Sequence, residues 1–232
     1  MEDITILTPV YKRNEFLQLW LMNIKNQSYS HKHLKVIVDE CKSDEPFIRN
    51  IEEVKQYLSP IQIEYKVYNS RSGIGEKRNR LIKSCKTPIF QFFDSDDLYF
   101  SECVKYNYEL MQKNKVQCVG SDKMVFAYVH DDYKLCGIDC GNKLSLIHEA
   151  TIMARKKWFN TTNKFQRRNC GEGKRLFEGM TKKQVAISDI KYVMCCLCHD
   201  GNTVPKDQFK NEDTDKTLDT NLTDFLDTIF KK

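Results

Sequence analysis

The sequence predicts an α/β fold with a mostly parallel, doubly wound sheet. Through the first 97 residues, short apolar segments typical of strands alternate with segments that have the apolar spacing of helices, which is the order of such a sheet. Residues 88–93 form a continuous aromatic-rich run, which indicates a strand buried on both faces. The run leads into Asp94, Asp96 and Asp97. Because ligands bind at the carboxyl ends of strands in open α/β sheets, these acids mark the candidate site.

The first half supplies four strands and three helices. Strands are expected at 4–10, 34–38, 61–67 and 88–93, and helices at 15–25, about 47–57, and 72–85. Polar segments follow all four strands, at 8–13, 39–44, 69–75 and 94–97. Acids at two of these ends, and glycines with basic residues at a third, can together hold a nucleotide and a metal ion.

The pattern changes after Asp97. A helix is expected at 101–113, a strand at 116–119, a hairpin from 124–129 and 133–138, strands at 147–154 and 190–197, and a helix at 175–180. From residue 205 onward the chain is polar, and it closes on an amphipathic stretch containing Leu218, Leu222, Phe225, Leu226 and Ile229. We expect this stretch to be a helix that docks on the body or on a partner, where it could support a homo-oligomer.

Composition limits the class of protein. The 232 residues fit one sizeable domain with or without an appendage, and 41% hydrophobic residues can supply its core. A net charge of +5, from 37 basic and 32 acidic residues, suits an anionic small ligand but not nucleic acid. Without a signal-peptide pattern or an apolar run of ~20 residues, we expect a cytoplasmic protein with no integral membrane segment.

Ten cysteines are many for such a protein, and we expect them to be reduced and mostly buried. The cluster at 195–199 contains three cysteines and His199. It lacks a second half at the usual zinc spacing, although Cys136 and Cys140 are present, so structural zinc is the less favoured interpretation.

The N-terminal half resembles family 2 glycosyltransferases of the GT-A fold, which are Rossmann-like. The matching motifs are ILTPVYKR at 6–13, VIVDE at 36–40, GIGEKRNR at 73–80 and the strand 89–93 followed by DSDD, which resembles a DxD element. Looser similarity continues through 149–156, 171–173 and HDGNT at 199–203. The resemblance implies a GT-A domain over 1–205, with a nucleotide-sugar-binding half at 1–120 and an acceptor-side half at 121–205. A linker and amphipathic helix would occupy 206–232.

The resemblance also implies roles for single residues. Asp39 would accept a hydrogen bond from the base, as a carboxylate suits the N–H of uracil; the alternative is a cap of the following loop. Lys77 and Arg78 follow a glycine loop and would bind phosphate, unless they form a solvated helix face. Asp94 would reach the ribose or a metal-bound water. The other residues expected in the donor site are Thr8, Pro9, Tyr11, Arg13, Gly73 and Ser95.

The resemblance further implies a divalent cation. Asp96 would be its direct ligand and His199 would complete the coordination, with Asp97 bracing the loop or capping the next helix. Hard oxygen ligands and a diphosphate select Mg²⁺ or Mn²⁺, and an imidazole favours Mn²⁺. The plainer alternatives are a solvated acidic turn and a structural histidine.

The catalytic base is expected at Glu172. Family 2 enzymes usually carry a Glu-Asp pair late in the domain, but residues 171–173 read Gly-Glu-Gly, so the second acid is missing. The next candidates for the base are Glu178, Glu149 and Asp189. The alternative interpretation of Glu172 is a surface acid at the start of a helix.

These features predict a metal-dependent inverting glycosyltransferase that moves a sugar, most readily from a UDP-sugar, to a hydroxyl of a glycan or glycoprotein. One alternative is a catalytically silent protein that binds a nucleotide sugar or a glycan. A nucleotidyltransferase would also use paired aspartates and a metal, but gives no reason for the Asp39 pocket. An RNA-binding module fits the mild charge least.

Overall fold

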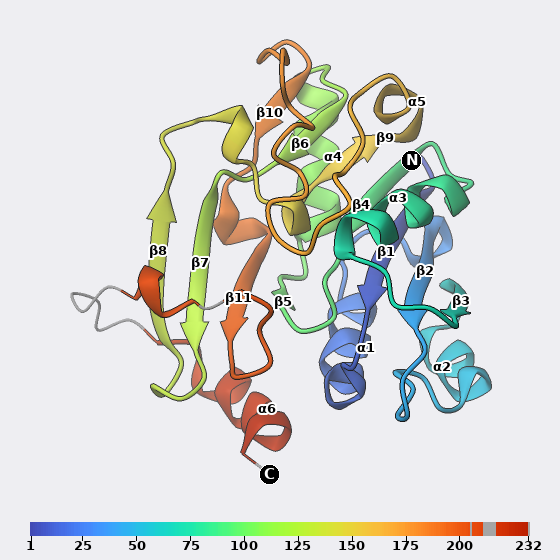
Figure 1. The fold of residues 1–232 in the computed structure, drawn as a ribbon, viewed down its shortest axis with the longest axis vertical. Helices are drawn as coiled ribbons and strands as arrows, with labels where there is room; N and C mark the ends of the chain where they lie inside the picture. The colour runs from blue at the N-terminus through green and yellow to red at the C-terminus, as the bar shows by residue number, and fades with distance from the viewer. Residues whose placement is uncertain (205, 211–216, 232) are drawn as a thin grey trace.

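The computed structural model describes residues 1–204, 206–210 and 217–231, and in this part of the chain two sheets stand side by side (Figure 1). The larger has seven described strands in the order β10 (Val185–Ile187), β6 (Cys118–Gly120), β9 (Met153–Arg155), β4 (Ile89–Phe92), β1 (Ile4–Val10), β2 (Leu34–Cys41) and β3 (Gln62–Tyr68). The smaller has four, in the order β5 (Leu98–Tyr99), β11 (Met194–Cys198), β7 (Lys123–Tyr128) and β8 (Lys134–Asp139). Within the predicted tail, residues 211–216 and 232 lie outside the described residues.

The larger sheet is parallel except for β9, which runs antiparallel to both β4 and β6. Every residue of β1 and of β4 is buried, as expected for strands covered on both faces. The two strands pair from Ile4 opposite Ile89 to Leu7 opposite Phe92. The predicted α/β class with a mostly parallel sheet and a smaller mixed part is therefore confirmed.

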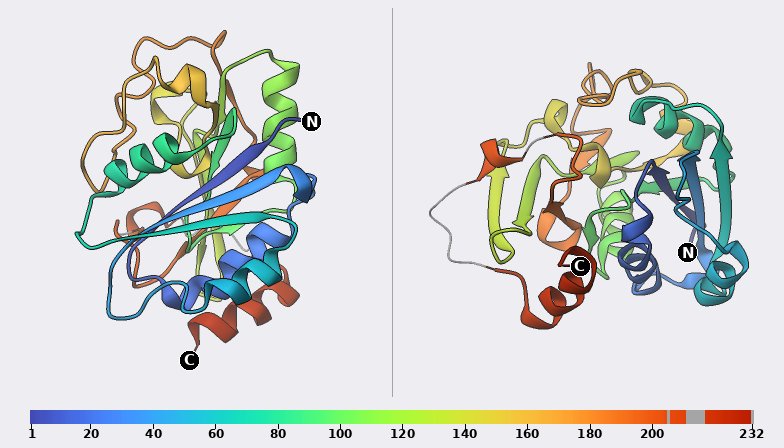
Figure 2. Two further views of the ribbon diagram at one scale, coloured as in Figure 1. Left: turned by 90° about the vertical axis from the view of Figure 1, so that its right-hand side faces the viewer. Right: turned by 60° about the horizontal axis from the view of Figure 1, so that its bottom comes forward.

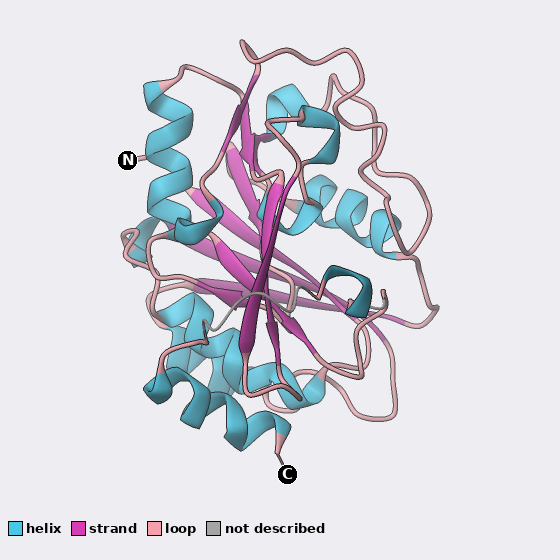
Figure 3. Cartoon of the chain, turned by 90° about the vertical axis from the view of Figure 1, so that its left-hand side faces the viewer, coloured by secondary structure: helices cyan, strands magenta, loops and turns pink. Residues whose placement is uncertain are grey.

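Helices cover both faces of this sheet (Figure 3). The α-helices of the described chain are α1 (Leu17–Lys25), α2 (Ile51–Leu58), α3 (Ile74–Ser84), α4 (Cys103–Lys113), α5 (Lys156–Phe159) and α6 (Thr220–Phe230), of which α6 packs on the smaller sheet. Buried residues of α1, α2 and α4 share one core with the sheet, and those of α3 and α5 share a second core on the other face. Among the described residues, no helix is long and apolar enough to cross a bilayer.

Helix α2 begins at Ile51, four residues later than predicted. The side chain of Asn50 accepts hydrogen bonds from the backbone N–H groups of Glu52 and Glu53, so it caps the helix at this point. Phe47, predicted inside the helix, is instead buried against the ring of Trp20, with 5.4 Å between ring centroids.

Three further expectations for the second half were wrong in detail. The strand predicted at 147–154 is mostly a 3₁₀ turn over Glu149–Thr151, followed by the short β9. Residues 175–180 form turns rather than a helix. The strand predicted at 190–197 begins only at Met194, after a 3₁₀ turn over Ile190–Tyr192. At 149–151 a hydrogen bond to a distant segment overrides the apolar pattern, since the Ser121 N–H donates to Thr151 Oγ1.

The smaller sheet contains the predicted hairpin, β7 and β8, and carries α6 on one side. Leu226 and Ile229 of α6 are buried in a core shared with the smaller sheet and with Leu19 of α1 (Figure 2). The Tyr133 hydroxyl donates a hydrogen bond of 2.8 Å to Asp227. The amphipathic helix predicted for the tail is confirmed, and its apolar face packs on its own chain.

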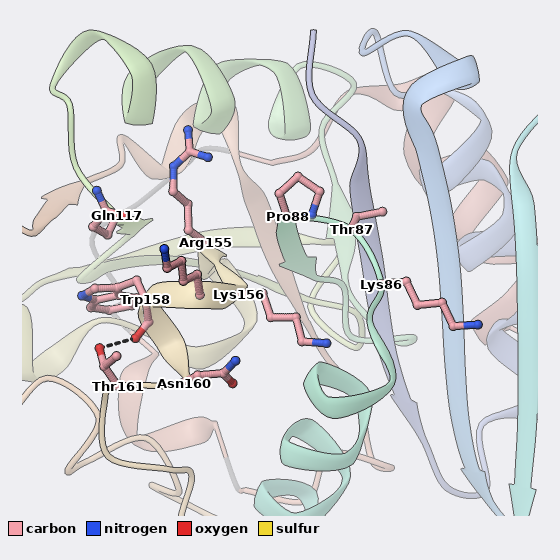
Figure 4. A pocket seen from close by; sticks show the side chains of 10 residues that line it. Lys86, Thr87, Pro88, Gln117, Arg155, Lys156, Trp158, Asn160 and Thr161 are labelled. Atoms are coloured by element: carbon pink, nitrogen blue, oxygen red, sulfur yellow. Dashed lines mark hydrogen bonds between the residues drawn. The ribbon is translucent and has the colours of Figure 1, made fainter.

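An open pocket of about 860 Å³ lies where β4 begins, at the end of the sheet away from Asp94 (Figure 4). Its lining includes Lys86, Arg155, Lys156 and Trp158. Arg155 is paired with Glu2, and the Lys156 ammonium donates to backbone carbonyls. None of the residues that the sequence places in a nucleotide site lines this pocket.

Candidate active site

The predicted site residues gather at the carboxyl ends of β1, β2 and β4, which lie side by side. Asp39 lies near the carboxyl end of β2 and is opposite Pro9 of β1 in the parallel register. Asp94 follows the end of β4. Parallel pairing brings these ends to one edge of the sheet, where the chain also places α3 and the loop after β11.

The three acids after β4 have different surroundings. Asp94 accepts a hydrogen bond of 2.9 Å from Arg78. Asp96 accepts one of 2.9 Å from Arg13 Nε. Asp97 is buried and accepts from the Leu197 N–H at 3.2 Å. Burial, with the charges of the other two acids, raises the pKa of Asp97 to about 8, so Asp97 is a structural group of the smaller sheet, in line with the bracing role expected for it.

His199 stands against Asp96. Its Nε2 lies 3.5 Å from Asp96 Oδ2, and its ring packs against Phe16 and Phe230, with centroids 4.8 and 5.4 Å away. Burial raises the pKa of Asp96, but the His199 contact and the Arg13 charge outweigh it and leave the pKa below its usual value. The structure thus brings together the two predicted metal ligands, which are 103 residues apart in the chain.

Arg78 is the centre of the ionic network. Its guanidinium is 2% exposed and donates to Glu172 Oε1 at 3.0 Å and to Asp94 Oδ2 at 2.9 Å. It also lies 4.6 Å from the ring centroid of Phe92. Burial lowers the pKa of Arg78, but the surrounding carboxylates outweigh it and raise that pKa. Arg78 therefore joins the predicted base to the predicted donor site.

Asp39 is held by a residue outside the predicted site, Arg80. Arg80 Nε and Nη2 donate to the two Asp39 oxygens at 2.9 and 2.8 Å, and the guanidinium stacks 3.9 Å from the centroid of the Tyr68 ring. Sequence reasoning counted Arg80 among the basic residues at the third strand end but did not pair it with Asp39. A nucleobase N–H that reaches Asp39 must share its oxygens with this bidentate pair.

The other predicted donor-site residues differ in their surroundings, and two of them bond to groups of the protein itself. Thr8 is fully buried and accepts from the Trp20 indole at 2.9 Å, so its hydroxyl belongs to the core. The Lys77 ammonium donates to the Val10 carbonyl, and burial lowers the Lys77 pKa. The rest lie around them: Pro9 and Ser95 are buried, Tyr11 stacks with Arg71 at 4.6 Å, and Gly73 is the N-cap of α3.

A close crossing fixes Gly75 in α3. A Cβ atom there would lie 1.9 Å from the Gln166 carbonyl oxygen, so only glycine lets the segment containing Glu172 pass over the start of the helix. Gln166 N–H in turn donates to the Glu172 carbonyl at 2.8 Å. The glycine loop predicted for phosphate therefore also positions the predicted base.

Unsatisfied polar atoms concentrate in the site. Among the described residues, five buried side-chain N or O atoms lack a hydrogen-bond partner, and three are Arg78 Nη1, Asp94 Oδ1 and His199 Nε2. The last of these has only the longer, 3.5 Å contact with Asp96 Oδ2. A buried polar atom without a partner costs about 1–3 kcal/mol. Such a concentration is expected where a polar ligand completes the bonding.

The side chains of the site can bind a hard divalent cation only if a bound ligand supplies further coordinating oxygens. Within the described ranges, no group of three His, Cys, Asp or Glu side chains could hold a metal ion. Asp96 and His199 could supply two donors, with diphosphate oxygens and water as the others. His199 Nδ1 accepts from the Gly201 N–H at 3.1 Å, so metal binding through Nε2 requires this bond to open and the proton to move to Nδ1.

Sequence reasoning missed His148, whose Nδ1 accepts from the Ala150 N–H at 3.3 Å. Burial lowers the pKa of His148 to about 4, the Lys206 charge lowers it further, and Asp94 acts in the opposite direction. The only signal in the sequence was a polar pair, His148 and Glu149, between Ile147 and Ala150 in an otherwise apolar run.

The half-buried His148 imidazole predicts a pH dependence of stability. Its pKa falls from 6.5 to about 4 on folding, so its contribution is complete above pH 6.5 and is lost as the pH falls toward 4. By pH 5 the loss should be about 2 kcal/mol. His148→Asn, which keeps an acceptor for the Ala150 N–H, should lack this loss, as measured by urea unfolding at pH 7 and 5. The control is His130→Asn, at an exposed histidine. This variant retains His148 and should lose the same stability between pH 7 and pH 5 as the wild type.

Most of the chain matches a known family. Residues 5–175 match the family model described as Glycosyl transferase family 2. A processive diacylglycerol beta-glycosyltransferase of Mycoplasma pneumoniae is 28% identical over 110 residues, covering 47% of this chain and 32% of that protein. An uncharacterized glycosyltransferase of Haemophilus influenzae is 24% identical over 153 residues, covering 63% of this chain and 53% of that protein. The chain spans about a third to a half of the length of these relatives.

Solved structures share the fold. The S. aureus TarS 1-349 complex with UDP has a TM-score of 0.66 at 13% identity, covering 84% of this chain and 60% of that chain. The TarS 1-349 complex with UDP-GlcNAc has a TM-score of 0.64 at 13% identity, covering 86% and 60%. At this level of identity the likeness concerns the fold.

Proposed function

Because the chain belongs to glycosyl transferase family 2, we propose that it transfers a sugar from a nucleotide-sugar donor, most readily a UDP-sugar, to an acceptor hydroxyl with inversion. The observation that carries this proposal is the set of unpartnered atoms of Arg78, Asp94 and His199 at the carboxyl edge of the sheet. Complexes of TarS with UDP and UDP-GlcNAc support a UDP-sugar as the first donor to test.

In this proposal each group of the site has one task. Asp39, with Arg80, receives the base, and Arg78 offers its free Nη1 to the diphosphate. Asp96 and His199 would hold Mn²⁺ or Mg²⁺, whose charge stabilises the departing diphosphate. Arg13 keeps Asp96 ionised and in place.

A carboxylate must take the proton of the acceptor hydroxyl as it attacks the anomeric carbon. Glu172 is the residue predicted from the sequence, and burial raises its pKa while Arg78 acts in the opposite direction. A raised pKa suits proton transfer near neutral pH. Glu149 lies in the same cluster, since its charge also raises the pKa of Glu172.

A catalytically silent nucleotide-sugar- or glycan-binding protein is the second candidate, favoured by Gly173 where the family usually has an acid. Glycan and glycoprotein hydroxyls are the proposed acceptors. The name of the Mycoplasma pneumoniae relative adds diacylglycerol as an acceptor to test.

Two measurements separate these functions. A thermal-shift series with UDP-, GDP- and CDP-sugars, with and without Mn²⁺, should show a concentration-dependent rise in melting temperature with the correct donor. Release of nucleoside diphosphate, followed with and without each acceptor class, should then show turnover. Binding without release of the diphosphate would support the silent protein, and no shift with any sugar nucleotide would refute both.

A further inference from the structure

We propose that Glu149 is the catalytic base, and that it reaches the site through the space left by the side chain that Gly173 lacks. The inference rests on the proposed glycosyl transfer and assigns a residue to its proton-transfer step. It also gives Glu172 a different task, which is to position Arg78.

Glu149 and a side chain at position 173 would compete for one volume. The Gly173 N–H donates to Glu149 Oε1 at 2.8 Å. A Cβ atom on Gly173 would lie 2.7 Å from both Cγ and Oε1 of Glu149, closer than real Cβ contacts allow. Gly173 is not among the glycines with positive φ, so the backbone itself would accept a side chain. A side chain at position 173 would therefore have to displace the Glu149 carboxylate from its present position.

With Glu149 beside Gly173, the site contains two acids, Glu149 and Glu172. Glu172 and position 173 are adjacent in sequence, where the resemblance predicts two acids and the chain has one. Glu149 arrives from the 3₁₀ turn before β9, 24 residues away from Gly173. Both glutamates act on the same guanidinium, because each contributes to the raised pKa of Arg78.

The two glutamates differ in their exposure and in the donor that holds Oε1, which is a buried cation for Glu172 and a neutral backbone N–H for Glu149. Glu172 is 5% exposed, and its Oε1 is occupied by Arg78 Nε at 3.0 Å. Glu149 is only partly buried, and a backbone N–H fixes its Oε1. No side chain or backbone group in the described part of the chain donates a hydrogen bond to its Oε2. Glu149 is thus held in place with one oxygen available, as a general base requires.

The step balances without any further reactant. A Glu149 carboxylate oxygen takes the hydroxyl proton while the hydroxyl oxygen forms a bond to the anomeric carbon. The bond between that carbon and the diphosphate oxygen breaks, and its electron pair leaves with the nucleoside diphosphate. Water can replace the acceptor hydroxyl, so donor hydrolysis reports on the same base.

The first test is Glu149→Gln, which keeps an acceptor for the Gly173 N–H. With UDP-glucose and UDP-N-acetylglucosamine as probes and Mn²⁺ present, we expect UDP release to fall by about 10²–10⁴-fold, while UDP still raises the melting temperature as in wild type. Glu102→Gln, at an exposed acid 3.7 Å from Lys105, is the matched control and should keep the wild-type rate. A Glu149→Gln rate above a tenth of wild type would overturn the assignment.

Glu172→Gln separates base from positioning residue. If Glu172 acts through Arg78, this variant should weaken UDP binding and raise KM, but keep the acid limb of the wild-type pH–rate profile. Glu149→Gln should lose that limb. Loss of the limb in Glu172→Gln, with retention in Glu149→Gln, would assign the base to Glu172 and refute the proposal.

Exchanging the acid between positions provides a test that does not depend on activity alone. Gly173→Ala should lower the melting temperature in the wild-type background and have little effect in a Glu149→Ala background, because the clash is gone. Glu149→Ala combined with Gly173→Asp should release UDP faster than Glu149→Ala alone. Equal destabilisation by Gly173→Ala in both backgrounds would refute the shared volume.

Failure of the inference can be distinguished from failure of the proposed function. A wild-type protein that neither binds nor turns over any sugar nucleotide would overturn both. Wild-type protein that is active, with Glu149→Gln equally active, would overturn only the role of Glu149.

Discussion

Arg78→Met should destabilise the folded protein by about 3–5 kcal/mol, because it leaves buried carboxylates without their cation. Arg78 is 2% exposed and pairs at 3.0 Å or less with both Glu172 and Asp94. Methionine roughly preserves the apolar volume beside Phe92, so the loss isolates the ionic contribution. Urea unfolding at pH 7 measures it, and the same variant should lose the stabilisation by UDP.

A second substitution tests whether unpaired charge causes the loss of stability in Arg78→Met. Adding Glu172→Gln to Arg78→Met removes one of the uncompensated charges and should recover part of the lost stability. Arg49→Met, at an exposed arginine 3.6 Å from Glu45, should change stability by about 0.5 kcal/mol or less. A loss below about 1 kcal/mol for Arg78→Met would contradict the central role of this ion-pair network.

Asp96→Ala should remove Mn²⁺-dependent UDP binding and lower turnover by about a thousandfold or more, since a bound metal supplies several kcal/mol to the departing diphosphate. In the structure Asp96 is the group between Arg13 and His199, at 2.9 and 3.5 Å. The thermal shift produced by UDP, with Mn²⁺ and with EDTA, measures binding, and UDP release measures turnover.

Asp96→Asn distinguishes loss of metal binding from loss of folding stability. Asparagine keeps an acceptor for Arg13 but removes the charge, so it should retain most of the stability and still lose the effect of Mn²⁺. Asp139→Ala, at an exposed acid 2.7 Å from Lys123, should retain both. Full Mn²⁺-dependent binding by Asp96→Ala would exclude Asp96 as a ligand of the metal.

The N-terminal half could be predicted from the sequence because its signals are local. Buried parallel strands have continuous apolar runs, so β1, β2 and β4 and their order were recognisable, and the predicted GT-A fold is confirmed. The second half was less readable. The 3₁₀ turn at Glu149–Thr151 is held by hydrogen bonds to the distant Ser121, which no window of sequence contains.

The sequence by itself determined which strand ends meet and which acids and cations stand there, because parallel strands carry their following residues to one edge. Only the tertiary structure decided the partners: Arg78 with Glu172, Asp39 with Arg80, and Glu149 in the space beside Gly173. These pairs join residues 24 to 94 positions apart. Their geometry is set by how the loops cross over α3, as at Gly75, and charge pairing follows distance in space, not order in the chain.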